Sequence, residues 1–343
     1  MAYTTIDDPA LFFNTVLYTG TEVSGNSVTG VGFQPDWVWI KNRTDTTNHN
    51  TYDVVRGGNG TSHYFMKPNT GVGEGTNTSS LLTLDSDGFT LGDGNEVNGN
   101  NDNIVSWNWK AGGSASSNSD GTITSSVSAN TTSGFSIVGW SGNSGTVGHG
   151  LGIKPAVIII KSRSTTNNWV ILHKDLTSGM DEKGIVFNST NGEDSLGAGV
   201  SEPTSSVFTV TGGMASNDSQ IGYCLVEKQG YSKFGSYTGN GDADGRFVYT
   251  GFKPAFVMTK YYSGNGHGWH MQDNKRDGFN YNNHRLFANS TGGEETSVRM
   301  EFLCNGFKYR DNDGNGNGFK YIYFAFAESP FVNSNGIPNN PRG

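Results

Sequence analysis

The chain has little of what would indicate catalysis, disulfide chemistry or membrane insertion. Only two of its 343 residues are cysteines, Cys224 and Cys304, too few for a disulfide framework or a cysteine-based zinc site. The longest aliphatic run, residues 156–160, is far shorter than the roughly 20 residues that a membrane helix needs. It contains no G-x-S-x-G motif, phosphate-binding loop or dinucleotide fingerprint in context. The sequence therefore predicts a protein that is not an enzyme, needs no cofactor and is not inserted in a membrane.

Basic charge and helical periodicity are also scarce. The formal net charge is −8 at pH 7, which argues against nucleic acid or an anionic membrane as the main partner. One short segment, Asp7–Phe13, combines a capping Asp with Pro at a first helical position, and no longer helical pattern follows. Against these absences stand 50 glycines and 12% aromatic residues, with many Thr and Val, typical of short strands joined by tight turns. The composition predicts a mainly β fold with almost no helix.

One order of motifs occurs three times along the chain. Each copy has a Gly, then a Pro, then a run of β-branched or aromatic residues ending in Lys, in Gly32–Lys41, Gly152–Lys161 and Gly251–Lys260. A Phe motif follows at nearly constant spacing, and each copy closes on an apolar segment. Several motifs repeated in one order indicate three diverged copies of one module.

The Gly-to-Lys motif is typical of a buried strand. Pro suits the first residue of a strand because it has no N–H to donate, and the unbroken apolar run suits a strand buried on both faces. We expect the Lys at its end (Lys41, Lys161 or Lys260) to return the chain to solvent. In the closing segments aromatic residues alternate, for example Trp107 and Trp109. One set should face the core and the other should face outward or a neighbouring chain, where it would suit sugar stacking or a subunit contact.

These patterns predict tandem antiparallel β-sandwich modules. We expect sandwiches over residues 12–113, 134–230 and 231–332, with an N-terminal arm over 1–11, a flexible linker over 114–133 and a C-terminal tail over 333–343. The linker prediction rests on the Gly, Ser and Asn content at its start. The tail should be frayed or docked on a neighbouring chain.

A carboxylate and a guanidinium recur three positions apart in copies one and three, each after aromatic residues. Copy two has Asp175 in the matching motif but Ser178 at the Arg position. Such a pair suits recognition of a sugar or a carboxylate, and it equally suits a structural ion pair that ties a loop to the sandwich. The candidate ligand-binding residues are Asp53, Arg56, Trp269, Asp273 and Arg276.

A candidate calcium loop lies near the C-terminus. Asp311, Asp313 and Asn315 place oxygen ligands at alternate positions, as calcium loops do. The twelfth position holds Ile322 instead of Glu, and the loop lies between strands, so a plain hairpin loop is the alternative. Glu294, Glu295 and Glu301 are the carboxylates available to a glycosidase, a weak signal in any acidic protein.

A resemblance to a known family covers essentially the whole chain and is tightest in copy one. The motifs that carry it are Ala2–Pro9, Tyr18–Gly20, Gln34–Lys41, Tyr52–Gly57, Asp87–Gly92 and Trp107–Gly112. With these motifs the chain resembles the tail-fibre-like and virion structural proteins of marine and cyanobacterial tailed phages. The resemblance implies concanavalin A-like (jelly-roll) modules and a place in the virion, with assembly in the host cytoplasm.

The resemblance implies other virion proteins as partners and a homo-oligomeric state. We expect a tail fibre or appendage component that presents a host-facing surface, with a host glycan as the candidate ligand and residues 1–11 as the attachment arm. A capsid decoration, cement or connector protein is the alternative. A polysaccharide-degrading enzyme is the third.

Overall fold

The computed structural model describes residues 2–196, 200–211, 218–296 and 298–339, and nearly all of its regular structure is β-strand. The prediction of a mainly β fold built from antiparallel sheets is confirmed. Helix in this part of the chain is confined to the 3-10 turn η1 (Pro9–Leu11) and the single turns α1 (Asn95–Asn98) and α2 (Asn274–Asp277). Asp8 caps η1 by accepting a hydrogen bond from the Ala10 N–H. None of these turns is long or apolar enough to cross a membrane.

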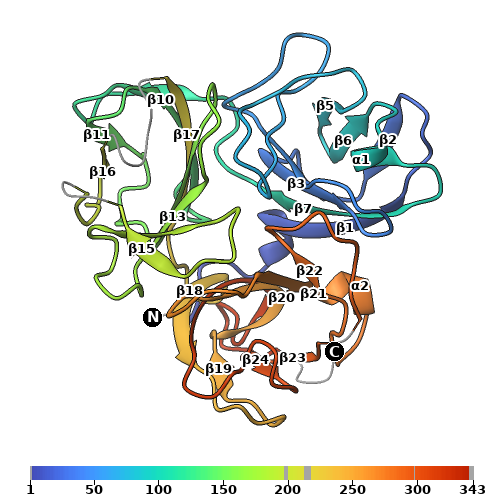
Figure 1. Ribbon diagram of the computed structural model, residues 1–343, viewed down its shortest axis with the longest axis vertical. Coiled ribbons are helices and arrows are strands. Elements are labelled where there is room, and N and C mark those ends of the chain that lie inside the picture. The colour runs from blue at the N-terminus through green and yellow to red at the C-terminus, as the bar shows by residue number, and fades with distance from the viewer. Residues whose placement is uncertain (1, 197–199, 212–217, 297, 340–343) are drawn as a thin grey trace.

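The strands form one lobe for each repeat, and the lobes surround a common centre (Figure 1). Module 1 (residues 12–113) has a four-stranded sheet in the order β1 (Phe13–Thr19), β7 (Asn103–Trp109), β3 (Trp37–Asn42) and β4 (Asn50–Asp53). Against it packs a three-stranded sheet in the order β2 (Asn26–Thr29), β6 (Gly88–Leu91) and β5 (Leu81–Asp85).

Module 3 (residues 231–332) repeats this arrangement. Its larger sheet has the order β18 (Ser232–Thr238), β25 (Lys320–Pro330), β20 (Phe252–Tyr261), β21 (Trp269–Asp273) and β22 (Leu286–Phe287). Its smaller outer sheet has the order β19 (Phe247–Tyr249), β24 (Gly306–Tyr309) and β23 (Met300–Leu303).

Module 2 contains the segment that composition assigned to a flexible linker. Its large sheet has the order β15 (Glu193–Ser195), β14 (Lys183–Val186), β13 (Val170–His173), β12 (Val157–Ser162), β17 (Ser219–Leu225), β10 (Phe135–Ser141), β9 (Ser125–Asn130) and β8 (Ser116–Asn118). Its outer pair is β11 (Gly145–Gly148) with β16 (Val207–Val210).

The prediction of a flexible linker over residues 114–133 is wrong. This segment supplies β8 and β9, and β9 pairs with the edge of β10. Val127 on β9 is buried in the core of module 2. Ladder hydrogen bonds and this burial outweigh the Gly- and Ser-rich composition at the start of the segment. We therefore take module 2 as residues 114–230.

The three Gly-to-Lys motifs supply β3, β12 and β20, which occupy the same place in their modules. Each pairs with the closing strand of its copy, in the registers Trp37↔Trp109, Val157↔Leu225 and Phe256↔Phe326. These registers give the residue correspondence between modules that is used below.

The central strands β3, β12 and β20 of the large sheets are buried on both faces, because one face of each sheet lies against the chain's common centre. The inner face of each sandwich has its own apolar cluster, and a further cluster joins side chains from all three modules. There Trp37 of module 1 stacks on Tyr223 of module 2, with ring centroids 4.5 Å apart. Phe187 of module 2 meets Trp269 of module 3 at 4.8 Å. The alternating Trp107 and Trp109, whose direction the sequence left open, both lie in this central cluster and join the modules to one another.

Both ends of the described chain lie on module 3. The Tyr3 hydroxyl donates to the Gly251 carbonyl (2.8 Å), and Ile6 is buried in the central cluster. The Ser334 N–H donates to the Asp7 carboxylate (2.7 Å). The N-terminal arm is therefore packed against its own chain in this structure, and the tail up to residue 339 packs there too.

Candidate functional site

The five residues predicted to bind a ligand are all buried. The Arg56 and Asp53 side chains form an ion pair of 2.5 Å with no exposed side-chain surface, and Arg276 and Asp273 form the same pair at 2.7 Å. Trp269 is fully buried as well. An external ligand cannot reach these groups, so the prediction of a ligand site is corrected in favour of the structural ion pair.

Each ion pair forms because the Asp ends a strand and caps the turn after it. Asp53 Oδ1 accepts from the Val55 and Arg56 N–H groups, which turns the Arg56 side chain back onto Asp53 Oδ2. Asp273 does the same with Lys275 and Arg276. The second Asp oxygen then faces the neighbouring module.

That second oxygen accepts a hydrogen bond across the contact between two modules, which is called a seam below. Tyr223 of module 2 donates its hydroxyl to Asp53 of module 1 (2.7 Å). Trp107 of module 1 donates its indole N–H to Asp273 of module 3 (3.1 Å). Tyr223 and Trp107 occupy equivalent positions on β17 and β7, so the contact is the same one repeated.

The third seam, between modules 2 and 3, has an apolar contact at the equivalent place. Val157 pairs with His173, so His173, and not Asp175, stands where modules 1 and 3 have Asp. The Arg position is then filled by buried Leu176 and not by Ser178. Phe324 of module 3, at the donor position, meets the His173 ring at 5.5 Å. Burial lowers the pKa of His173 to about 4, so at neutral pH this seam carries no charge at the acceptor position.

A carboxylate recurs at the outer end of each seam. The backbone N–H groups of Glu294, Glu74 and Glu193 donate to the carbonyls of Arg43, Arg163 and Tyr262, respectively. Each of these carbonyls lies two residues after the Lys that ends the Gly-to-Lys motif. Arg43 and Glu294 also form a two-point ion pair (2.9 and 2.6 Å), as do Arg163 and Glu74 (both 2.9 Å). At the third seam an aromatic residue, Tyr262, replaces the Arg.

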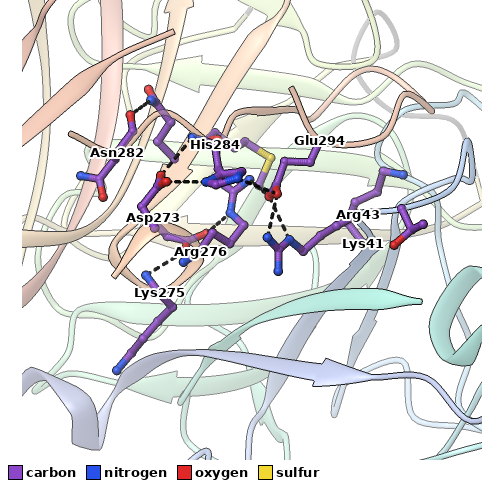
Figure 2. Close-up of polar contacts among 12 residues, drawn as sticks. Lys41, Arg43, Asp273, Lys275, Arg276, Asn282, His284 and Glu294 are labelled. Atoms are coloured by element: carbon purple, nitrogen blue, oxygen red, sulfur yellow. Dashed lines mark hydrogen bonds and ion pairs between the residues drawn. The ribbon is translucent and has the colours of Figure 1, made fainter. Parts of the chain in front are cut away.

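The seam between modules 1 and 3 holds a connected charge network (Figure 2). Glu294 accepts from Arg43, contacts Arg276 Nη1 at 3.1 Å and lies 3.6 Å from His284 Nε2. His284 Nδ1 contacts the Asp277 carboxylate. The two other candidate glycosidase carboxylates are also ion-paired, Glu295 with Arg285 and Glu301 with Arg310. This arrangement suits the fixing of loops more than proton transfer.

The lysines at the ends of the anchor strands are buried, contrary to the expectation that they return to solvent. Lys41, Lys161 and Lys260 have no exposed surface, and their ammonium groups donate to carbonyl oxygens. Lys41 reaches Thr291 O of module 3 (3.2 Å) and Lys260 reaches Thr190 O of module 2 (2.9 Å). The strand ends lie at seams, where loop carbonyls of the next module need donors.

Burial of these lysines makes stability depend on pH. Desolvation lowers the pKa of Lys260 to about 7 and those of Lys41 and Lys161 to about 8. The unfolded chain keeps these protons up to about pH 10.4. Between pH 7 and that value the folded state therefore holds fewer protons, and the free energy of unfolding rises with pH through these groups.

We expect Lys260→Met to remove its share of this rise. Wild-type stability should gain about 2 kcal/mol relative to the variant between pH 7 and pH 9, as Lys260 loses its proton in the folded state only. Urea unfolding of both proteins at pH 7, 8 and 9 measures the difference. The matched control, Lys320→Met at an exposed position, should follow the wild type at all three pH values. Parallel wild-type and Lys260→Met curves would contradict the expectation.

The predicted calcium ligands have separate protein partners. Asp313 pairs with Arg285, Asp311 accepts from a backbone N–H, and buried Asn315 donates to Asn240 Oδ1 (2.7 Å). These contacts hold a hairpin loop and do not direct the three side chains to one point. Within the described residues no group of three or more His, Cys, Asp or Glu side chains is placed to hold a metal ion.

The outer sheet of module 3 carries exposed aromatic residues. Phe247 and Tyr249 point outward from β19 and are 45% and 53% exposed. Across the sheet Phe247 is opposite Lys308, and Lys308 is opposite Glu301. The ring of Phe247 lies over Gly306, where a Cβ would come within 2.8 Å of it. Two further exposed aromatic residues, Tyr281 and Phe279, belong to the loop next to β23.

Modules 1 and 2 carry small residues at the same positions. Val248 corresponds to Val28 and Val147, because each pairs with the Phe of the neighbouring strand. Phe247 and Tyr249 therefore match Ser27 and Thr29 in module 1 and Thr146 and Gly148 in module 2. Within the described residues all aromatic side chains classed as exposed lie in module 3.

Comparison with known proteins assigns the three modules together to one family. Residues 8–330 match the family described as Domain of unknown function (DUF7483). The chain belongs to this family. No curated protein and no solved structure matches it. The DUF7483 match begins before the first sandwich and ends at the last residue of β25, so it covers all three modules and their seams.

The aromatic residues on the outer face of this DUF7483 chain were not among the predicted site residues. The sequence could have indicated them through a comparison of the three copies at the outward-facing positions of β19 and its equivalents. At these positions only copy three has Phe and Tyr in place of small residues. The prediction from sequence chose the repeated Asp and Arg residues, and in the structure these residues join the modules.

Proposed function

We propose that this chain is a non-catalytic virion surface protein of a tailed phage that binds a glycan through the outer face of module 3. The observation that carries the proposal is the replacement of Ser, Thr and Gly by Phe247 and Tyr249 on that face alone. Exposed rings beside polar groups offer a flat apolar surface to sugar rings. The resemblance of the sequence to phage tail-fibre-like proteins supports the virion assignment. Antibody labelling of intact virions tests that location.

Other parts of the molecule agree with a binding role. The repeated charged residues are used at the seams, and the candidate glycosidase carboxylates are held in ion pairs. A rigid scaffold that presents a variable face is how binding sites are commonly built. Homo-oligomerisation and contacts with other virion proteins belong to the same proposal.

Binding of the whole chain to an array of bacterial surface polysaccharides tests the glycan assignment. We expect Phe247→Ser with Tyr249→Thr, which installs the module 1 residues, to weaken binding at least tenfold, or about 1.4 kcal/mol. The exposed positions should leave stability within about 0.5 kcal/mol of wild type. The matched control, Ser27→Ala with Thr29→Ala in module 1, should bind normally. Absence of binding to every polysaccharide would favour the decoration or cement role.

A further inference from the structure

A pocket of about 290 Å³ opens beside the outer sheet of module 3. Its wall includes Lys275, Phe279, Asn274, Asn282, Lys253 and Glu328. Asn280 links the pocket to the outer sheet, because its side chain pairs with both backbone polar groups of Phe302 on β23. The pocket therefore lies at the β23 edge of the outer sheet, two strands from Phe247 and Tyr249 on β19.

Two of its side chains have surface to offer a ligand. Phe279 is 77% exposed, the largest exposed fraction among the large apolar residues described. Lys275 is exposed and, within the described residues, its ammonium group contacts no carboxylate. Figure 2 shows its side chain extending away from the Asp273 and Arg276 network. The wall thus supplies one free cation beside one free ring in a chain whose net charge is −8.

The other charges in the wall cancel each other. Lys253 Nζ lies 3.2 Å from Glu328 Oε1, and Asn274 Nδ2 donates to Glu328 Oε2 at 2.8 Å. With its amide nitrogen used in this way, Asn274 keeps its side-chain oxygen Oδ1 inside the structure without a hydrogen-bond donor. This oxygen is closed off from solvent, so Lys275 and Phe279 are the side chains of the wall that offer surface to a ligand.

We infer that this pocket binds an acidic sugar residue. The anionic group of the sugar would lie against Lys275, and the apolar face of the ring would rest on Phe279. A neutral sugar would leave Lys275 unused, and a simple anion would leave Phe279 unused. The inference rests on the proposed glycan-binding function and names the class of sugar.

The corresponding positions in the other modules lack this chemistry. Asn274 and Lys275 follow the strand-ending Asp273 as Val54 and Val55 follow Asp53 in module 1. Those two valines pack against the central apolar cluster. The pocket chemistry therefore belongs to the module that also carries the exposed aromatic face.

Titration of the full chain with an oligomannuronate and with its carboxyl-reduced form tests the inference. We expect the wild type to bind the uronate at least tenfold more tightly than the reduced, neutral form. Lys275→Gln should reduce uronate affinity to the neutral level and leave neutral affinity unchanged. Phe279→Ala should weaken both. The matched control, Lys320→Gln at an exposed site away from the pocket wall, should behave as wild type.

The outcomes separate this inference from the function beneath it. Equal wild-type affinity for both oligosaccharides, with no effect of Lys275→Gln, overturns the acidic-sugar assignment and leaves glycan binding in place. Loss of affinity for both forms in Lys275→Gln, with an unchanged melting temperature, also overturns it, because charge would not be what Lys275 contributes. Absence of binding to either form and to the polysaccharide array overturns both proposals.

Discussion

Replacing Arg56 by leucine should lower the free energy of unfolding by about 3–5 kcal/mol. The guanidinium lies fully buried against Asp53 and also donates to the Thr51 and Tyr64 carbonyls. Without it the buried Asp53 carboxylate loses its ion-pair partner and is left with hydrogen bonds alone. Urea unfolding monitored by tryptophan fluorescence measures the loss.

The chain itself provides the matched control for this variant. Module 2 has His173 and Leu176 at these two positions, facing Phe324. A triple variant with Asp53→His, Arg56→Leu and Tyr223→Phe copies that apolar seam into the junction of modules 1 and 2. We expect it to recover most of the stability lost in Arg56→Leu, since buried ion pairs are often replaceable as a set. A triple variant less stable than the single one would show that the two seams differ in packing as well as in charge.

Trp37→Ala should also cost about 3–5 kcal/mol, and the whole chain should then still unfold in one transition. Trp37 stacks between Trp109 of its own module (4.4 Å) and Tyr223 of module 2 (4.5 Å) and is 4% exposed. Since the central cluster includes all three modules, a cavity there weakens every module together. Calorimetry should give a single peak at a lower temperature, with agreement between the calorimetric and van't Hoff enthalpies.

Phe279→Ala is the control for the loss of a large ring. Because Phe279 is mostly exposed, its removal should change stability by no more than about 0.5 kcal/mol. Three separate transitions in either variant would contradict the view that the modules form one cooperative unit.

The sequence predicts the strands well because their signals are local. Pro at the start of a strand and an apolar run after it identified β3, β12 and β20, and the repeat identified their partners. What covers the second face of such a strand is not a local property. An unbroken apolar run fits a contact with the same chain or with another, so Trp107 and Trp109 were open to both interpretations.

The candidate site was harder to predict for a related reason. Asp53 and Arg56 stand in a pattern that suits a ligand as well as a buried pair, and only their exposure decides between the two. Asp175 was matched to Asp53 because both are aspartates. The strand pairing instead places His173 at the position of Asp53, since Val157 pairs with His173 as Trp37 pairs with Asp53. Phe279 and Tyr281 stand where module 1 has Asn59 and Thr61, because Met271 pairs with Leu286 as Thr51 pairs with Met66. Comparison of these two loops was the signal that could have indicated them.

The seams all run in one direction around the ring. Module 1 donates a hydrogen bond from Trp107 to module 3, and module 2 donates one from Tyr223 to module 1. Module 3 places Phe324 against module 2 at the equivalent position. Such head-to-tail contacts, closing after three steps, have the geometry of a cyclic trimer. In a trimer of identical subunits, any substitution that alters one outer surface alters all three. In a single chain one module can change its outer surface while the other two keep theirs, so a new specificity can arise on module 3 without a threefold effect on solubility or assembly.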